Sequence, residues 1–225
     1  FIRTDWKLVL KRAFSLIELL VVIAVIGILA SVMVPAISGG YSLSRTTVCK
    51  NVQRQLVVAG ASYRNDHNTF PPAVVSMFVH WDDETVLWQY VGVEKEKMVC
   101  PEHTHTDFST TGYNYNTSFI GDERIIGSGI LRKGVPPSSC SHPAQCAMFG
   151  DGHNNKFMRS TLSSLSIRCG GRQAFRHNNA TVVAWLDGHV NTQEAMFNNN
   201  CSDEELVGFL SSDDSAYDPR TLKLH

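Results

Sequence analysis

The sequence lacks the short motifs that mark the common nucleotide-dependent and nucleophilic enzymes. It has no G-x-S-x-G nucleophile elbow, no P-loop and no dinucleotide-binding fingerprint. Its formal net charge of -1 over 225 residues is too small to indicate a nucleic-acid surface. We therefore expect no catalytic residue, no cofactor and no nucleic-acid partner.

Charge is also nearly absent from one long stretch near the N-terminus. From Phe14 to Ile37 the only ionisable side chain is that of Glu18. A helix through this stretch would be roughly 36 Å long at about 1.5 Å per residue, which exceeds a hydrocarbon core of about 30 Å. The sequence therefore predicts a transmembrane helix over 14–37. A carboxylate inside such a span costs about 2.5–3.5 kcal/mol, so Glu18 indicates a functional role.

A short basic segment precedes this apolar run. Residues 1–13 contain four basic side chains against one acidic one, namely Arg3, Lys7, Lys11 and Arg12 against Asp5. By the positive-inside rule this excess favours a cytoplasmic N-terminus. The remainder of the chain would then lie in the periplasm or at the cell surface, held by a single span of the bacterial inner membrane.

The junction of the two segments resembles the N-terminal signature of type IV prepilins and pseudopilins. It reads Lys11-Arg12-Ala13-Phe14-Ser15-Leu16-Ile17-Glu18. The resemblance implies that prepilin peptidase cuts between Ala13 and Phe14, that the new amine of Phe14 is methylated, and that Glu18 guides filament assembly. The residue before the cut is usually Gly in that family. Pro35 falls where such helices commonly carry a kink. The implied partners are the peptidase and like pilin or pseudopilin subunits, which form a homo- or hetero-oligomeric filament.

Two other interpretations of the same segment stay open. A secretory signal peptide would have a small-x-small cleavage site, which Ala36-Ile37-Ser38 imitates, but its apolar region is only about 7–15 residues long. A plain single-span anchor would explain the apolar run, but neither the carboxylate of Glu18 nor the abrupt change from basic residues to Phe14.

The helix is expected to continue beyond the membrane over residues 38–65. Paired glycines in Ser38-Gly39-Gly40 are a possible interruption, since each costs about 1 kcal/mol relative to Ala. Apolar residues then recur at helical spacing, at Val48, Val52, Leu56, Ala59 and Tyr63. The segment from Asn65 to Pro72 ends the helix. This gives a leader at 1–13, a span at 14–37, an amphipathic continuation at 38–65 and a head at 66–225.

The head shows short apolar runs separated by turn residues. Residues 113–116 alternate aromatic with polar side chains, as a half-buried strand would. Residues 174–177, 181–186 and 189–191 read as three strands of a meander joined by two-residue turns, Asn178-Asn179 and Asp187-Gly188. A capping box at 202–205 predicts a short helix through Leu210. The predicted fold class is α+β, pilin-like, with a long N-terminal helix packed on an antiparallel β-sheet.

The C-terminal part of the head carries a second resemblance. His177, nine intervening residues and Asp187-Gly188 match the H-X9-DG motif of a pilin-like family of planctomycete-type bacteria, often labelled a domain of unknown function. The strand between the two residues would separate them by nearly 20 Å at about 3.3 Å per residue, which argues against a catalytic pair. We therefore expect structural roles, with Asp187-Gly188 in a turn and His177 bonded to neighbouring backbone.

Six cysteines follow the predicted span, in what would be an oxidising compartment. Cys140 and Cys146 enclose a short loop and form the candidate disulfide, whereas Cys49 is interpreted as a buried free thiol beside the helical stripe. Three local sets offer metal ligands: Cys100 with His103 and His105, Asp151 with His153, and Asp187 with His189. None has a recognised zinc spacing, so no metal is predicted.

The sequence as a whole favours a non-enzymatic filament subunit. The alternative is a membrane-anchored, adhesin-like protein that binds surface polymers. Aromatic residues exposed on the head would serve that alternative, and Trp81, Trp88 and Tyr113 are the candidates.

Overall fold

The computed structural model describes residues 15–76, 78–103, 111–121, 125–126, 129–130, 133–153, 156–158, 171–198 and 205–220. By internal contacts the chain divides into two compact units, Phe1–Tyr41 and Ser42–His225. The leader, the predicted cleavage pair Ala13-Phe14, His105 and most of the predicted capping box at 202–205 lie outside the described residues.

The first unit consists, over its described part, of the beginning of helix α1 (Leu16–His67). The helix continues through Pro35, and Ser38 Oγ donates to the Pro35 carbonyl at 2.9 Å. It also continues through Gly39 and Gly40, so the interruption considered there does not occur. A cost of about 1 kcal/mol per glycine is small beside the many backbone hydrogen bonds of a helix this long.

In the second unit, the C-terminal half of α1 packs on the head through one face. Its buried residues are Cys49, Val52, Gln53, Leu56, Val57, Ala59 and Gly60. The predicted stripe is right in the middle and wrong at its start, because Val48 is 44% exposed and Cys49 is buried. Gln53 and Gly60 belong to the buried face although neither is apolar. At Gly60 an added β-carbon would meet the terminal methyl of Met148, so the flexible end of that side chain would have to move.

The helix ends where the sequence predicts. Its last residue is His67, and Asn68 takes a left-handed conformation with φ 54°. Asn tolerates this conformation better than most residues, which suits the position just after a helix. The backbone N–H of Asn68 donates to the Arg64 carbonyl at 2.8 Å, which satisfies one of the free carbonyls of the last turn.

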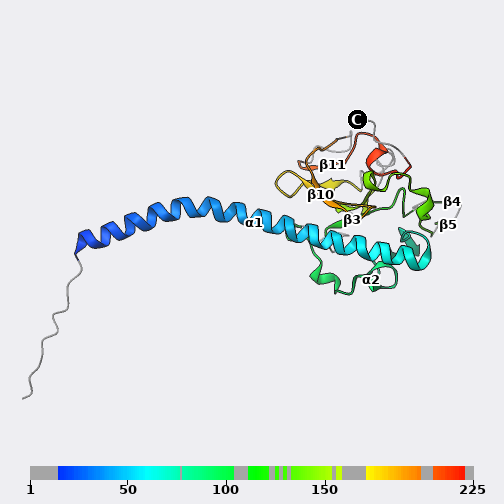
Figure 1. Cartoon of the computed structure of the whole chain (residues 1–225), viewed down its shortest axis with the longest axis horizontal. Helices are drawn as coiled ribbons and strands as arrows, with labels where there is room; N and C mark the ends of the chain where they lie inside the picture. Colours follow the sequence, from blue (N-terminus) through cyan, green and yellow to red (C-terminus); the bar gives the residue numbers. More distant parts are fainter. Residues whose placement is uncertain are drawn as a thin grey trace, which may run out of the picture. The chain divides into compact units, whose positions relative to one another are not determined.

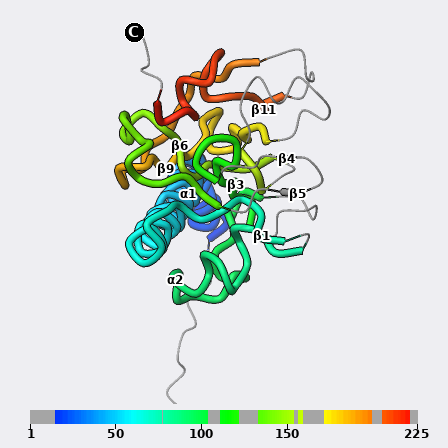
Figure 2. Tube along the Cα trace, turned by 90° about the vertical axis from the view of Figure 1, so that its right-hand side faces the viewer, coloured from blue at the N-terminus to red at the C-terminus, as the bar shows by residue number. Residues whose placement is uncertain are grey.

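The main sheet of the head has five strands in the order β10-β9-β6-β3-β7. They are β10 (Val190–Gln193), β9 (Thr181–Trp185), β6 (Ala147–Asp151), β3 (Tyr113–Asn116) and β7 (Phe157–Met158). All neighbouring pairs are antiparallel except β3 with β7, which is parallel. Figure 1 shows strands β3 and β10 on one side of the C-terminal half of α1 and the α2 segment on the other, and Figure 2 shows β9, β6 and β3 beside the helix. The predicted α+β class is confirmed.

Two details of the predicted head are wrong. Strand β8 (Gln173–Ala174) pairs with β11 (Val207–Gly208) and not with β9, so the three-stranded meander does not form. The described end of the predicted helix near Leu210 is extended instead, since it contains β11 and a bridge between Phe197 and Phe209. Long-range pairing prevails there over local helix signals, because both Phe209 and Leu210 become buried.

The remaining elements are short and connect the larger ones. They are β1 (Val74–Ser76), β2 (Val79–His80), η1 (Glu84–Trp88, a π-helix), α2 (Gln89–Val91), η2 (Lys95–Lys97), β4 (Ile125–Ile126), β5 (Gly129–Ile130), η3 (Pro137–Ser139), η4 (Pro143–Gln145) and η5 (Asp214–Ala216). β1 pairs with β2 and β4 pairs with β5, each pair antiparallel.

Aromatic side chains form the centre of the core. The rings of Trp81, Tyr115 and Phe149 lie with centroids 5.1–5.5 Å apart, within the usual range for aromatic pairs. Trp81 Nε1 donates to the Lys156 carbonyl and Tyr115 Oη to the Pro71 carbonyl, so both polar ends are satisfied. The aromatic residues that the adhesin-like alternative would need on the surface are buried: Trp81 and Tyr113 are 0% exposed and Trp88 7%.

Strand β3 is buried on both faces, not on one as predicted. Its asparagines bond to backbone of other segments. Asn116 Nδ2 donates to the carbonyls of Ala147 and Tyr217, each at 2.8 Å, and Asn114 Nδ2 donates to the Arg172 carbonyl at 3.3 Å. An amide that finds such partners can be buried at little cost, so the polar positions of the alternating pattern are also inside.

A buried carboxylate joins three parts of the head. Asp82 lies 2.7 Å from Lys95 Nζ and 2.8 Å from Lys156 Nζ. Burial by itself would raise the pKa of Asp82, but the hydrogen bonds and charges of Lys156 and Lys95 outweigh it and hold the pKa below its ordinary value. The ionised Asp82 therefore stabilises the folded head above its unfolded pKa, and this stabilisation is lost as the pH falls through its lower folded pKa.

Replacing this carboxylate should destabilise the head. We expect Asp82→Ala to lower the free energy of unfolding by about 3 kcal/mol at neutral pH, because two partly buried ammonium groups lose their partner. Chemical denaturation of the purified protein measures the change. Glu94→Ala is the matched control, since its pair with Lys97 is exposed and should be worth about 0.5 kcal/mol or less. Equal effects of the two substitutions would contradict the assignment.

Candidate functional site: the N-terminal motif and a buried Cys–His–Asp cluster

The N-terminal turn of α1 contains Glu18 in a defined hydrogen-bonded position. The backbone N–H of Ser15 donates to Glu18 Oε2 at 2.9 Å, and Ser15 Oγ accepts from the backbone N–H of Ile17 at 3.3 Å. This reciprocal arrangement is a capping box, formed by the Ser-x-x-Glu spacing. The Ser-x-x-Glu spacing is present in the sequence, but the interpretation of Glu18 as an assembly residue alone missed its role in capping the helix.

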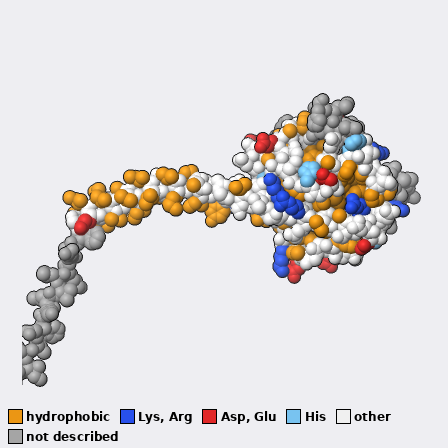
Figure 3. Space-filling model, in the orientation of Figure 1, with side chains coloured by type: hydrophobic (Ala, Val, Ile, Leu, Met, Phe, Trp, Pro, Cys, Tyr) orange, Lys and Arg blue, Asp and Glu red, His pale blue; other side chains and the backbone are white. Residues whose placement is uncertain are grey.

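The helix that follows is apolar and exposed on all sides within its own unit. Its most apolar 18-residue window has a mean hydropathy of 2.8, and none of that window is buried. Figure 3 shows hydrophobic side chains along this part of α1, with an acidic group near its beginning. Within the described part of the chain, α1 is the one helix that is long and apolar enough to cross a membrane.

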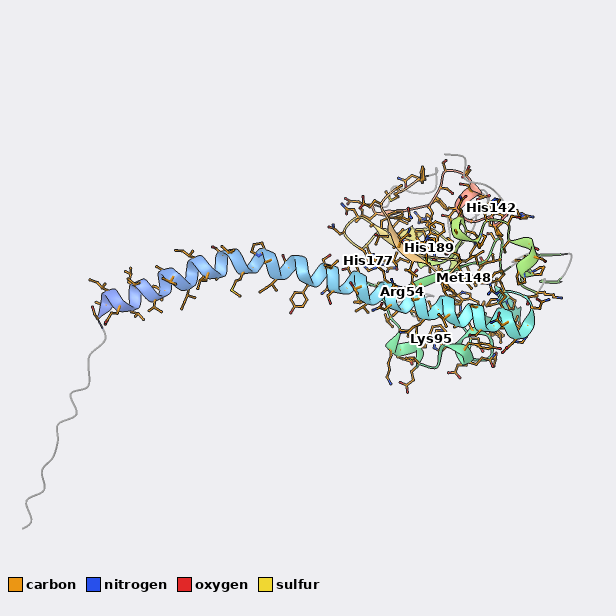
Figure 4. All side chains as sticks on the ribbon, viewed as in Figure 1. Arg54, Lys95, His142, Met148, His177 and His189 are labelled. Atoms are coloured by element: carbon orange, nitrogen blue, oxygen red, sulfur yellow. The ribbon has the colours of Figure 1, made fainter. Side chains whose placement is uncertain are left out.

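The turn after β8 positions His177. Asn178 and Asn179 have φ of 54° and 62°, and the backbones of His177 and Ala180 exchange hydrogen bonds of 2.9 and 3.1 Å. This is the two-residue turn predicted from the Asn-Asn pair. The main chain of His177 closes this turn. Its ring, which was expected to bond neighbouring backbone, lies inside the head beside α1 and faces other side chains instead (Figure 4).

The Asp187-Gly188 turn differs from the prediction. Trp185 N donates to the His189 carbonyl and Gly188 N to the Trp185 carbonyl, each at 2.9 Å. Gly188 has a φ of 98°, and Asp187 is not among the residues with positive φ. The loop therefore has three residues and closes with a glycine bulge. Asp187 Oδ1 contacts Nδ1 of His189 at 2.6 Å, so its partner is a surface histidine and not His177.

The ring of His177 belongs instead to a buried cluster that no local motif indicates. One ligand-type atom from each of Cys49, Cys100, Asp151 and His177 lies within 4.8 Å of all the others, and all four residues are buried. Cys49 comes from α1, Cys100 follows η2, Asp151 ends β6 and His177 lies in the turn after β8. Sequence reasoning considered Cys100 and Asp151 only with near neighbours, because residues this far apart give no spacing signal.

The contacts inside the cluster are short. Cys49 Sγ lies 2.9 Å from Cys100 Sγ, and His177 Nε2 lies 3.5 Å from Cys100 Sγ and 3.3 Å from Asp151 Oδ2. The other ring nitrogen, Nδ1, lies 3.9 Å from a carboxylate oxygen of Glu102. Asp151 also accepts from the backbone of Val182 at 2.8 Å.

These contacts shift the ionisation of the cluster. Burial alone would lower the pKa of His177, but the contacts with Asp151 and Cys100 raise it to about 10. The hydrogen bond from Cys49 lowers the pKa of Cys100 to about 6, against the effect of burial and together with the contact from His177. The same hydrogen bond and burial raise the pKa of Cys49. The folded cluster therefore favours an imidazolium beside a carboxylate and a thiolate.

The geometry does not match a catalytic relay. In a nucleophile–His–Asp triad the two ring nitrogens serve different partners, one facing the nucleophile and the other the carboxylate. Here Nε2 of His177 faces both Cys100 and Asp151. Cys100, Asp151 and His177 are at most 2% exposed, so a substrate would not reach them in the folded head. Thiolate, imidazole and carboxylate groups are the ligands that zinc prefers, so these four residues are of the types that hold a transition-metal ion.

Cys140 and Cys146 do not form the predicted bridge in this structure, since both are free thiols. Cys146 Sγ donates to the Tyr217 carbonyl at 2.9 Å and also accepts from the amide of Asn116 at 3.6 Å. Cys49 is buried, as interpreted from the sequence, and is unbonded in this structure.

Comparison with known proteins identifies the N-terminal region alone. The family model of the prokaryotic N-terminal methylation motif matches residues 10–34, which include Ala13, Phe14 and Glu18. Neither the curated proteins nor the solved structures give a significant match to the chain. The chain therefore carries a prepilin-type N-terminal motif on a membrane-length helix, whereas the H-X9-DG resemblance receives no support from these comparisons.

The charge on His177 should make the stability of the head depend on pH. Because the pKa of His177 is higher in the folded head than in the unfolded chain, its protonation stabilises the folded state. This contribution is complete below the unfolded pKa of about 6.5 and is lost as the pH rises through about 10. His177→Asn should therefore destabilise the head by about 3 kcal/mol near pH 6 and by much less near pH 10. The thermal midpoint of the protein with its thiols reduced, measured across that range, tests this.

His189→Asn is the control, because it removes a histidine from a surface turn and should leave the shape of the pH profile unchanged. A profile of the His177 variant that runs parallel to that of the wild type would contradict the ionic role.

Proposed function

We propose that this protein is a structural subunit of a type IV pilus-like or type II secretion pseudopilus-like filament, processed by prepilin peptidase between Ala13 and Phe14. The observation that carries the proposal is the N-terminal methylation motif on a membrane-length apolar helix whose one ionisable group, from 14 to 37, is Glu18. The packing of the second half of that helix on a sheet is the pilin-like arrangement that such a subunit requires.

Glu18 supplies the negative charge for assembly. Cleavage before Phe14 creates a cationic amine at the start of an apolar helix, where a charge without a partner is costly. A carboxylate of a neighbouring subunit at the same depth removes this cost in both subunits. The negative charge of Glu18 also suits the first turn of its own helix, where the helix dipole is positive.

The orientation follows from the basic residues before the span. Their excess favours a cytoplasmic N-terminus, where the peptidase acts, and an exported head. The proposed partners are thus the peptidase, like subunits and the inner membrane. In this proposal the protein is not an enzyme, in keeping with a cluster whose side chains are buried and whose histidine uses one nitrogen for two partners.

The adhesin-like alternative loses its main candidates. The aromatic residues proposed to bind polymers, Trp81, Trp88 and Tyr113, are all buried in the core. No second function is therefore favoured by a specific observation on the described residues.

Processing is the direct test of the pathway. When the protein is produced with prepilin peptidase, we expect it to lose residues 1–13 and to begin with N-methylated Phe14. Intact mass and N-terminal sequencing of protein from membranes, with and without the peptidase, measure this. An unprocessed N-terminus in the presence of an active peptidase would contradict the proposal, and a start near Gly39 would indicate a secretory signal peptide.

Substitutions at the first turn separate assembly from helix capping. Glu18→Gln retains a side chain that can complete the capping box but removes the charge, so it should insert normally and reduce filament yield about tenfold or more. Ser15→Ala weakens the cap by about 1 kcal/mol and keeps the charge, so it should assemble nearly as the wild type does. Filaments sheared from cells and quantified by immunoblot give the yield.

A wild-type filament yield from the Glu18→Gln protein would rule out the assembly role. A loss in the Ser15→Ala protein as large as that in Glu18→Gln would show that the cap, and not the charge, is what assembly requires.

A further inference from the structure

Two buried thiols meet at the contact between α1 and the head. Cys49 and Cys100 are separated by 51 positions in the sequence, and their sulfurs lie 2.9 Å apart. Both are free and at most 1% exposed. Two sulfurs at this distance are closer than ordinary non-bonded contact and need to approach by less than 1 Å to reach the disulfide length of about 2.05 Å.

The carboxylate of Asp151 already has hydrogen-bond donors within the head. The oxygen of Asp151 that faces the cluster, Oδ2, already receives the backbone N–H of Val182 at 2.8 Å, His177 Nε2 at 3.3 Å and Thr181 Oγ1 at 3.5 Å. The other oxygen accepts from Gln53 at 3.3 Å. These donors satisfy the carboxylate, so it needs no metal ion in order to be buried.

The distance between the sulfurs lies about midway between that expected for a shared zinc ion and that of a disulfide. Two thiolates held about 2.3 Å from one zinc ion at tetrahedral angles are about 3.8 Å apart. The observed 2.9 Å is shorter than this by about 0.9 Å and longer than a disulfide by about 0.85 Å, so either state requires a similar movement of the two sulfurs.

We propose that Cys49 and Cys100 form an intramolecular disulfide that fastens the C-terminal half of α1 to the head. The inference depends on the proposed function in one respect, because it requires export of the head to a compartment that oxidises thiols. It adds to that function a covalent link between the helix that enters the filament and the domain it displays.

The oxidant is the disulfide of a thiol–disulfide carrier protein. Cys49, on the helix, first exchanges with it to give a mixed disulfide and one carrier thiol. The Cys100 thiolate then attacks Cys49 Sγ and releases the second carrier sulfur as a thiolate. The two cysteine protons end on the two carrier sulfurs, so the carrier is reduced by two electrons and the head is oxidised by two.

The neighbouring groups suit the second step. His177 Nε2 lies 3.5 Å from Cys100 Sγ, so a positive charge on the ring favours the attacking Cys100 thiolate. Since both sulfurs are inaccessible in the packed head, exchange with the carrier precedes the final packing of α1 on the sheet. The finished bond is then shielded from reductants outside the protein.

Peptide mapping tests the bond directly on the full-length protein, extracted in detergent from envelopes of cells that contain the peptidase. Free thiols are alkylated during lysis, and the protein is digested with trypsin without reductant. Cleavage at Arg45, Lys50, Lys97 and Arg124 places Cys49 in peptide 46–50 and Cys100 in peptide 98–124. We expect these two peptides to be joined, and to separate when reductant is added.

Two results would overturn the proposal. One is folded protein in which both peptides are alkylated and no metal is bound. The other is alkylation of both peptides together with one equivalent of zinc, measured by elemental analysis, which would assign the cluster to a metal. The N-terminus is sequenced in the same sample. A failure of processing at Phe14 is therefore scored separately from the state of the cysteines.

Substitutions give an independent measurement. A closed loop of this length should raise the thermal midpoint by about 10 °C, so Cys49→Ser, Cys100→Ser and the double variant should each lower it by that amount. Cys140→Ser is the matched control and should leave it nearly unchanged. Losses that add in the double variant would contradict a shared bond, because removing either sulfur already breaks it.

Discussion

The head is organised around the buried carboxylate of Asp151. It accepts hydrogen bonds from Gln53 of α1 and from the backbone of Val182 in β9, and it faces the ring of His177. A buried charge is tolerated only when its lone pairs are satisfied, so the helix, the sheet and the turn have to occupy fixed positions around it. Apolar packing already buries one face of α1, and these polar contacts fix its position on the sheet further.

This constraint explains why the helical stripe was predicted only in part. The periodicity of apolar residues correctly predicts that Val52, Leu56 and Ala59 are buried, but it does not predict the burial of Gln53 or Gly60. Gln53 can be buried because its amide donates to Asp151 in β6 and to the Val182 carbonyl in β9. Gly60 is buried because the side chain of Met148 lies where a side chain of its own would be. Neither reason is local, so neither is present in the sequence around α1.

The features near the N-terminus could be predicted because they are local. An apolar run, a single carboxylate and a basic flank are local properties, and they led to the prepilin-type motif that the family model also identifies. The turn at Asn178-Asn179 and the end of α1 near Asn68 were likewise correct, because each depends on one or two residues. The pairing of β8 with β11 and the cluster around His177 join segments far apart in the chain, and such contacts leave no spacing to recognise.

The capping box at the start of α1 affects the carboxylate of Glu18 in a subunit that is in the membrane and not yet assembled. Because the carboxylate of Glu18 accepts the backbone N–H of Ser15, it has a donor within its own chain before any neighbour arrives. In the proposed filament, Glu18 would exchange this donor for the cationic amine of a neighbouring subunit. The cost that assembly removes is then mainly that of the unpartnered amine, and less that of the carboxylate.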